Sequence, residues 1–198
     1  MPLSCIAPLN MMNKFFLVGI PGSGKTTLGR RTADILQIPF FDTDVMVKNK
    51  LGGVAISDLF RSSFSTLFIE EQEKSIAQFA ETDTPSLIAT GAEVGLIPQC
   101  IKYMNNMGYI IHIKRSPDAI LEFQKSNGKS GLILYNETDG TKIDMQEKSV
   151  RIYAESLLEY DEIADRMLDN NGNEDEGAEK LKVMIEELSG DLHAGSLV

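Results

Sequence analysis

Residues 15–30 read FFLVGIPGSGKTTLGR, and this stretch decides the fold of the chain. An apolar run leads into a glycine-rich loop of the pattern G-x-x-x-x-G-K-[ST], from Gly19 to Thr26, and a helical pattern follows the loop. A strand, such a loop and a helix in succession are typical of a phosphate-binding loop, whose main-chain N–H groups gather phosphate oxygens at the start of a helix. The sequence therefore predicts an α/β fold built on a P-loop.

The residue types in the loop fit this chemistry. Gly19, Gly22 and Gly24 stand where the chain must take backbone conformations that a Cβ would hinder. Lys25 is expected to reach the β- and γ-phosphates, and the Thr26 hydroxyl to bind Mg²⁺. ATP and Mg²⁺ are therefore the predicted cofactors. The residues predicted to bind the nucleotide are Gly22, Ser23, Gly24, Lys25, Thr26 and Thr27.

The composition limits the remaining classes of function. The chain has 198 residues, of which 42% are hydrophobic and 24% charged, and 19 basic against 29 acidic residues give a net charge of −10. Nucleic acid and anionic membranes both require a basic face, so neither is an expected partner. No apolar run approaches the ~18 residues of a membrane span. Cys5 and Cys100 are not spaced for a metal site, so we expect a reduced, cytoplasmic protein, and we expect it to be a monomer.

The order of the predicted elements gives the architecture. Apolar strand patterns alternate with helical ones, which predicts about five parallel strands with helices on both faces. The predicted strands are 15–18, 38–42, 87–90, 109–113 and 163–169. The predicted helices are 26–37, 45–51, 64–82, 98–107, one beginning after Ser116, 143–160 and 178–188. Because ligands bind beyond the carboxyl ends of parallel strands, the P-loop, Asp42, Asp44 and Gly91 are expected to share one cleft.

A single domain is expected over residues 13–190. Residues 1–12 are interpreted as a disordered leader and residues 191–198 as a frayed tail. Residues 125–143 lose helical and strand periodicity, so they are expected to form an excursion outside the core. His112 alternates with apolar residues in its strand and is interpreted as a core or edge histidine with a hydrogen-bond partner, not as a metal ligand.

From about residue 14 to residue 188 the chain resembles the shikimate kinase family. The resemblance rests on the segments GIPGSGKTTLGR, FFDTD, SLIATG, IHIKRSPDAIL and ESLLEYDEIAD. It implies the P-loop NTPase fold of the nucleoside-monophosphate-kinase and shikimate-kinase type, with the 125–143 segment as a lid over ATP. It also implies transfer of the γ-phosphoryl group of ATP to an acceptor hydroxyl, which in this family is the 3-hydroxyl of shikimate.

The resemblance also assigns roles to the two aspartates of FFDTD. Asp42 would help to hold Mg²⁺ through water, so Thr26 and Asp42 are the predicted metal residues. Asp44 would position the acceptor hydroxyl and accept its proton. The competing interpretation of the pair is a turn and a helix cap, because Asp is favoured in both places. Nucleotide-base contacts are expected around Lys114, Arg115 and the turn near Asn170.

The acceptor side departs from the family pattern. An arginine of the long helix is replaced by Ile69, and an arginine of the late helix by Ser156. The family's three glycines after the third strand are Gly91, Ala92 and Glu93 here. These three residues, together with Asp44, are the predicted acceptor-binding residues.

The lid departs as well. Its Arg-Pro-Leu-Leu is replaced by Ser-Gly-Leu-Ile from Ser130, preceded by Lys129. Lys129 would take the place of the lid arginine as a point charge, or it is a solvated loop residue. With Lys25 and Asp44, Lys129 completes the predicted catalytic set.

These departures leave two hypotheses for function. Shikimate is a carboxylate, and the loss of its arginine partners next to the added Glu93 would cost about 3–5 kcal/mol of affinity. The first hypothesis is a kinase whose acceptor is shikimate, held by Arg61 or Arg151 instead, or another alcohol that is neutral or cationic. The alternative is an ATP-binding protein of this family that transfers nothing and acts through a partner.

Overall fold

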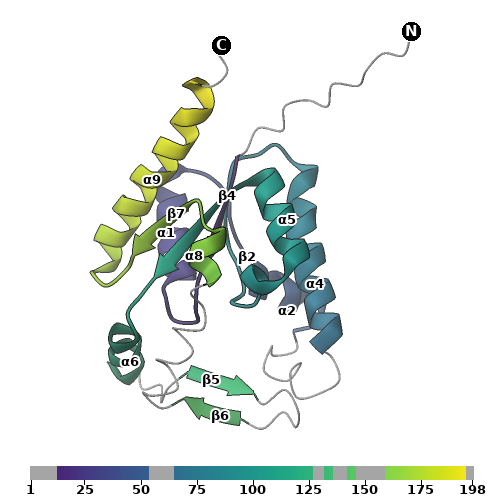
Figure 1. The fold of residues 1–198 in the computed structure, drawn as a ribbon, viewed down its shortest axis with the longest axis vertical. Helices are drawn as coiled ribbons and strands as arrows, with labels where there is room; N and C mark the ends of the chain where they lie inside the picture. The colour runs from purple at the N-terminus through teal and green to yellow at the C-terminus, as the bar shows by residue number, and fades with distance from the viewer. Residues whose placement is uncertain (1–12, 54–64, 127–131, 136–141, 146–158, 195–198) are drawn as a thin grey trace.

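The computed structural model describes residues 13–53, 65–126, 132–135, 142–145 and 159–194. Its centre is a parallel sheet of five strands in the order β2-β3-β1-β4-β7 (Figure 1). The strands are β1 (Lys14–Val18), β2 (Phe40–Asp42), β3 (Ser86–Ala89), β4 (Gly108–Lys114) and β7 (Arg166–Asp169). The predicted five-stranded parallel sheet is confirmed. β2 lies at an edge of the sheet, as expected for a strand preceded by Pro39.

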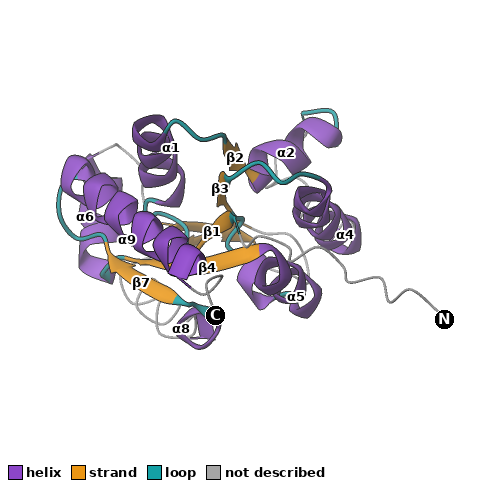
Figure 2. Cartoon of the chain, turned by 90° about the horizontal axis from the view of Figure 1, so that it is seen from above, coloured by secondary structure: helices purple, strands orange, loops and turns teal. Residues whose placement is uncertain are grey.

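Helices cover both faces of this sheet (Figure 2). The helices are α1 (Lys25–Leu36), α2 (Thr43–Lys50), α4 (Ser65–Ala77), α5 (Pro98–Met107), α6 (Pro117–Ser126), α8 (Glu159–Ile163) and α9 (Glu174–Ala194), with the 3-10 turns η1 (Gln78–Glu81) and η2 (Val94–Leu96). α1 and α9 lie on one face, and α4 and α5 lie on the other. No helix within the described ranges is both long enough and apolar enough to cross a bilayer.

The residues of β1 divide between the two faces with the period of a strand. Phe16 packs among residues of α4 and α5, such as Ile76 and Met104. Leu17 points to the opposite side and packs among residues of α1 and α9, such as Leu28. A strand buried on both faces must be apolar throughout, which is why the run before the P-loop is uninterrupted.

Several elements differ from the sequence-based expectation. β7 begins at Arg166 and not at residue 163, which belongs to α8, and β5 (Leu132–Tyr135) lies in the segment expected to lack strand periodicity. The predicted helix 143–160 is wrong at its start, because β6 (Lys142–Met145) pairs antiparallel with β5 in a separate two-stranded sheet. Four residues that alternate polar and apolar fit a short strand as well as a helix, and pairing with β5 decides between them. Residues 146–158 lie outside the described part of the chain.

The last helix is longer than expected. α9 begins at Glu174, not at residue 178, because the Asn173 side chain caps it by accepting the N–H of Glu176 at 2.8 Å. Three acidic residues in its first turn stabilise the helix by interacting with the positive end of its dipole. α9 then runs to Ala194, so residues 191–194 belong to a helix and not to a frayed tail. The expected leader, residues 1–12, lies outside the described residues.

The close pairing of β4 with β1 makes one glycine sensitive to substitution. Gly108 pairs with Lys14, and a Cβ at position 108 would overlap with the Lys14 carbonyl oxygen. We expect Gly108→Ala to lower the free energy of unfolding by about 3 kcal/mol, because a backbone atom cannot yield as a side chain can. Gly190→Ala is the matched control: it lies in α9 with nothing within 4 Å of the added Cβ. It should raise stability by about 0.5–1 kcal/mol through helix propensity. Urea unfolding of both variants measures this, and equal effects would contradict the packing argument.

Candidate functional site

The P-loop has the backbone that its sequence predicts. Gly19, Gly22 and Gly24 have φ values of 144°, 84° and 103°, in a region that L side chains rarely adopt. Gly24 is the N-cap of α1, and no side chain caps this helix end. The N–H groups of the first turn of α1 therefore face the loop without a side-chain acceptor, which is the arrangement that binds phosphate.

Lys25 is the buried cation of this loop. Its ammonium donates to the carbonyl oxygens of Gly19 and Ile20, at 2.7 and 3.1 Å, and the residue is 9% exposed. Burial lowers the pKa of Lys25 to about 8, against the opposing effect of nearby carboxylates, first of all Asp44. Keeping the Lys25 ammonium charged in this buried position therefore costs free energy, and the negative charge of bound phosphate oxygens would reduce that cost.

Thr26 and Asp42 meet at the place predicted for Mg²⁺. The Thr26 hydroxyl donates to Asp42 Oδ2 at 2.8 Å. The other oxygen of Asp42 accepts the N–H groups of Asp44 and Val45, at 3.1 and 3.3 Å, and so caps α2. The two interpretations of Asp42 are thus compatible, because one oxygen caps the helix and the other faces the P-loop. A hydroxyl and a carboxylate oxygen fit an ion that takes few protein ligands and keeps several waters.

Asp44 lies at the start of α2 and faces α4. Gln72 Nε2 donates to Asp44 Oδ1 at 2.9 Å. Burial raises the pKa of Asp44, and the hydrogen bond from Gln72 opposes that rise. A Cβ at Gly91 would stand 2.5 Å from Asp44 Oδ1 and 2.7 Å from Gln72 Nε2, so a side chain at this position would have to displace the ends of both. The Gly91 N–H is held by the Thr43 hydroxyl at 2.9 Å.

The two residues after Gly91 differ in character. Ala92 is 8% exposed and belongs to the buried hydrophobic core. Burial raises the pKa of Glu93, and the charge of Asp44 adds to the rise while Lys25 opposes it. Glu93 is therefore electrostatically coupled to both Asp44 and Lys25. Ile69, the position expected to replace a family arginine, is an apolar side chain at 42% exposure.

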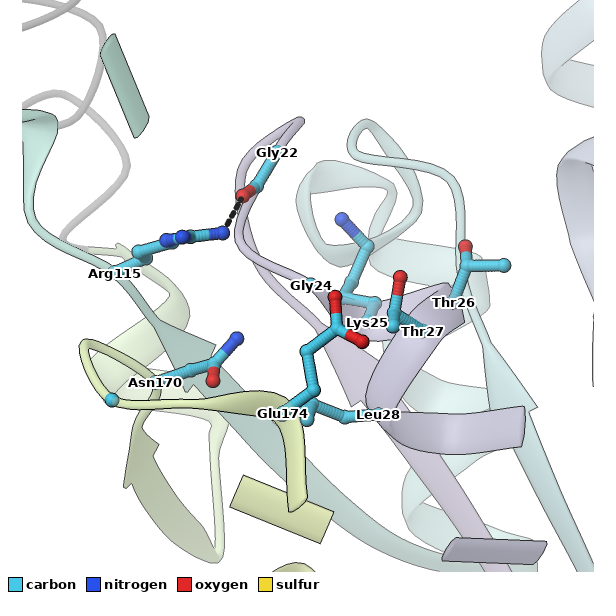
Figure 3. A pocket seen from close by; sticks show the side chains of 10 residues that line it. Gly22, Gly24, Lys25, Thr26, Thr27, Leu28, Arg115, Asn170 and Glu174 are labelled. Atoms are coloured by element: carbon cyan, nitrogen blue, oxygen red, sulfur yellow. Dashed lines mark hydrogen bonds between the residues drawn. The ribbon is translucent and has the colours of Figure 1, made fainter. Parts of the chain in front are cut away.

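A cavity of about 200 Å³ opens beside the P-loop (Figure 3). Its lining residues are Gly22, Gly24, Lys25, Thr26, Thr27, Leu28, Arg115, Asn170, Gly172 and Glu174. Arg115 and Asn170 face the P-loop from the opposite wall, and Arg115 Nη1 donates to the Gly22 carbonyl oxygen at 3.4 Å. Both residues were expected near the nucleotide. Lys114 points elsewhere, and its ammonium pairs with Asp161 at 2.7 Å.

Asn170 also holds the P-loop directly. Its Nδ2 donates to the Ser23 carbonyl oxygen at 2.7 Å, and its backbone N–H donates to the Lys114 carbonyl oxygen at 2.7 Å. The residue is 6% exposed, and a Cβ at Gly24 would overlap with its amide nitrogen. Asn170 therefore fixes the orientation of the Ser23–Gly24 peptide from the far side of the loop.

The remaining predictions divide into those the structure places and those it does not describe. His112 has the expected partner, since its Nδ1 lies 2.6 Å from Asp161 Oδ1, and burial lowers the pKa of His112. Sequence reasoning did not identify Gln72, and it named only the turn around Asn170. Lys129 lies outside the described residues, as do four other positions expected to replace or supply family arginines: Arg61, Ser130, Arg151 and Ser156.

Comparisons with known proteins agree with this architecture. A family model described as shikimate kinase matches residues 21–186. The shikimate kinase of Paracidovorax citrulli is 32% identical over 105 residues, which are 52% of this chain and 57% of the relative. That of Caldanaerobacter subterraneus is 34% identical over 110 residues, 56% of this chain and 63% of the relative. The match thus spans somewhat more than half the length of these two relatives.

A solved structure of similar fold is the shikimate kinase from Acinetobacter baumannii in complex with shikimate. It has a TM-score of 0.69 and 19% identity, and the match covers 90% of this chain and 96% of that one. At this identity the likeness establishes the fold alone.

The pKa of Lys25 gives nucleotide binding a defined pH dependence. Phosphate oxygens would raise this pKa from about 8, so binding takes up a proton wherever the free protein has lost it. We expect affinity for a magnesium nucleotide to be level up to about pH 7 and to fall above pH 8, towards about tenfold per pH unit. Calorimetric titration in two buffers of different ionisation enthalpy measures the uptake. Absence of proton uptake at pH 8.5 would contradict this account of Lys25.

A second prediction concerns Asn170. Asn170→Asp replaces the donor to Ser23 by a carboxylate oxygen of the same shape, which repels the carbonyl oxygen. We expect nucleotide affinity to fall by about 10- to 100-fold, or about 1.4–3 kcal/mol. Asn171→Asp is the matched control, because Asn171 Oδ1 only accepts, from the Ser116 N–H at 2.9 Å. It adds the same charge and keeps the bond. Equal losses in the two variants would point to charge and not to the orientation of the loop.

Proposed function

The chain belongs to the shikimate kinase family, and from this membership we propose that it is an ATP-dependent kinase acting on a hydroxyl group of a small molecule. The observation that carries the proposal is the arrangement around Lys25. The P-loop ammonium lies within the electrostatic influence of Asp42, Asp44 and Glu93, which come from the ends of two other strands. Phosphoryl transfer requires mainly alignment and charge neutralisation, and these groups supply both.

The nucleotide half of the proposed site is the P-loop and the cavity beside it. The N–H groups between Gly22 and Thr27 would hold the phosphates, and Lys25 would turn from the carbonyls of Gly19 and Ile20 to the β- and γ-phosphates. Thr26 and Asp42 would hold Mg²⁺, directly or through water. When bound, Mg²⁺ neutralises charge on the phosphate oxygens. Arg115, in the cavity wall, would lie against the nucleoside.

The acceptor half centres on Asp44. Its carboxylate would align the acceptor hydroxyl with the γ-phosphorus, held in place by the hydrogen bond from Gln72. The acceptor oxygen forms a bond to phosphorus, the bond from phosphorus to the ADP oxygen breaks, and the hydroxyl proton passes to Asp44. Burial raises the pKa of Asp44 from its ordinary value, which brings it nearer to that of a base effective at neutral pH.

Several finer points belong to this proposal. Lys129 of the lid is proposed to approach the transferring phosphate. Shikimate is the acceptor that family membership suggests, and another alcohol fits the altered residues 69 and 91–93. We propose a monomeric, cytoplasmic enzyme. The alternative, a protein that binds ATP without transfer, is disfavoured because a decayed acceptor site would not be expected to retain Asp44 in a hydrogen-bonded, partly buried setting.

Two variants test the proposed roles. Lys25→Ala should abolish nucleotide binding, because the loop loses its only ammonium. Asp44→Asn should lower kcat by about 10²- to 10⁴-fold and leave nucleotide affinity nearly unchanged, because the amide cannot accept the proton. Asp34→Asn, on the exposed side of α1, is the control and should keep full activity. The measurement is acceptor-dependent ADP release with shikimate, methyl shikimate and myo-inositol. Turnover by Asp44→Asn at the unaltered rate would exclude the assigned role.

A further inference from the structure

A neutral side chain stands at the centre of the acceptor half. Gln72 is fully buried on α4, and its Nε2 donates to Asp44. Its Oε1 is also buried and has no hydrogen-bond partner among the described residues. A buried acceptor without a donor is costly, so a ligand that supplies a hydroxyl would be favoured there. We call Gln72, Asp44 and Glu93 the acceptor subsite.

The charges of the acceptor subsite are acidic. The charge of Asp44 acts on Glu93, and both acids act on Lys25. The Lys25 ammonium is bonded to the loop carbonyls and, in the proposed reaction, to the nucleotide phosphates. Within the part of the chain that the structure describes, Lys25 is the cation that acts on these two acids. A carboxylate brought to this subsite would meet two like charges, whereas a hydroxyl would meet acceptors that it can satisfy.

Gly91 limits how this balance can change. A side chain at position 91 would displace the ends of Asp44 and Gln72, which lie in hydrogen-bond contact with each other. Ile69, on the same helix as Gln72, offers only an apolar surface. The subsite therefore offers acceptor oxygens, and position 69 adds no positive charge to α4, which suits a ring or chain that carries hydroxyl groups and no acid.

We propose that Gln72, Asp44 and Glu93 select an uncharged polyhydroxylated acceptor over a carboxylate-bearing acceptor of the same shape. The inference rests on the proposed kinase function, and it adds the chemical class of the substrate. Gln72 acts as a positioning residue: it orients Asp44 through Nε2 and receives a substrate hydroxyl through Oε1.

The experiment compares two probes that differ in one group. Shikimate and methyl shikimate have the same ring and the same hydroxyls, but the ester has no charge. Each is titrated calorimetrically against the unaltered protein saturated with magnesium and a non-hydrolysable ATP analogue. We expect the ester to bind at least about tenfold more tightly than the acid, because like charges in a closed site cost affinity. Equal binding, tighter binding of the acid, or binding of neither overturns the proposal.

Variants of the subsite sharpen the result. Glu93→Gln should tighten shikimate binding and leave the ester unchanged, which narrows the ratio by at least about threefold. Glu70→Gln, an exposed position on α4, is the control and should leave the ratio as it was. An unchanged ratio in Glu93→Gln overturns the role of Glu93, provided that its melting temperature matches that of the unaltered protein.

Gln72→Leu tests the positioning role. It should weaken binding of the ester and lower kcat while leaving affinity for the magnesium nucleotide unchanged, because Asp44 loses the hydrogen bond that orients it towards the acceptor. Loss of stability with kcat and ester binding unchanged would mean that Gln72 is only structural.

Because the titrations need no turnover, they separate two failures. Preferential binding of the ester without ADP release refutes the proposed kinase function and supports the charge selection. ADP release together with tighter binding of shikimate than of the ester supports the proposed kinase function and refutes the charge selection.

Discussion

The pairing of β1 with parallel neighbours on both sides is the constraint on which the site depends. Leu17 pairs with Ala89 of β3, and Val18 pairs with His112 of β4, so all three strands end at the same edge of the sheet. The chain that follows each strand then supplies a different part: the P-loop after β1, Gly91 after β3 and Arg115 after β4. β2 adds Asp42 at the same edge through its pairing with β3. Four segments that are distant in the sequence become one site because their strands are parallel and in register.

The electrostatics of the site follow from this convergence. The buried ammonium of Lys25 interacts electrostatically with three acidic residues that lie outside the P-loop. Each acid is restrained in a different way, since Asp42 caps α2 and bonds Thr26, while Asp44 is held by Gln72. Glu93 follows Gly91, where the chain turns away from β3. The nucleotide side is therefore built to receive negative charge, and the acceptor side is built to supply it.

Sequence patterns predicted the parts of this structure that local chemistry determines. The P-loop glycines, the parallel sheet indicated by alternating strands and helices, and the capping role of Asp42 all follow from residue type and spacing. Gln72 and Asn170 could not be found in the same way, because their importance lies in a partner that is distant in the sequence, Asp44 and Ser23 respectively. The one signal in the sequence that could have indicated Gln72 is its polar side chain on the helix face that also carries Phe68 and Ile76. The strand β6 was missed for a similar reason, since pairing with β5 and not its own four residues decides its structure.

The division of the proposed site into two halves explains how this chain can keep the family fold while side chains near Asp44 change. The phosphate half depends on backbone conformation, and a change at Gly19, Gly22 or Gly24 would strain the chain whatever the substrate. The acceptor half depends on side chains carried by α4 and by the segment after β3. The sheet determines where these segments lie but not which side chains they carry. Ile69 is exposed, so substitution there leaves the core intact. Gly91 is the exception on that half, because its space is taken by Asp44 and Gln72 themselves. Charge on the proposed acceptor side can therefore change at position 69 with little effect on folding, while a side chain at position 91 would have to displace the ends of Asp44 and Gln72.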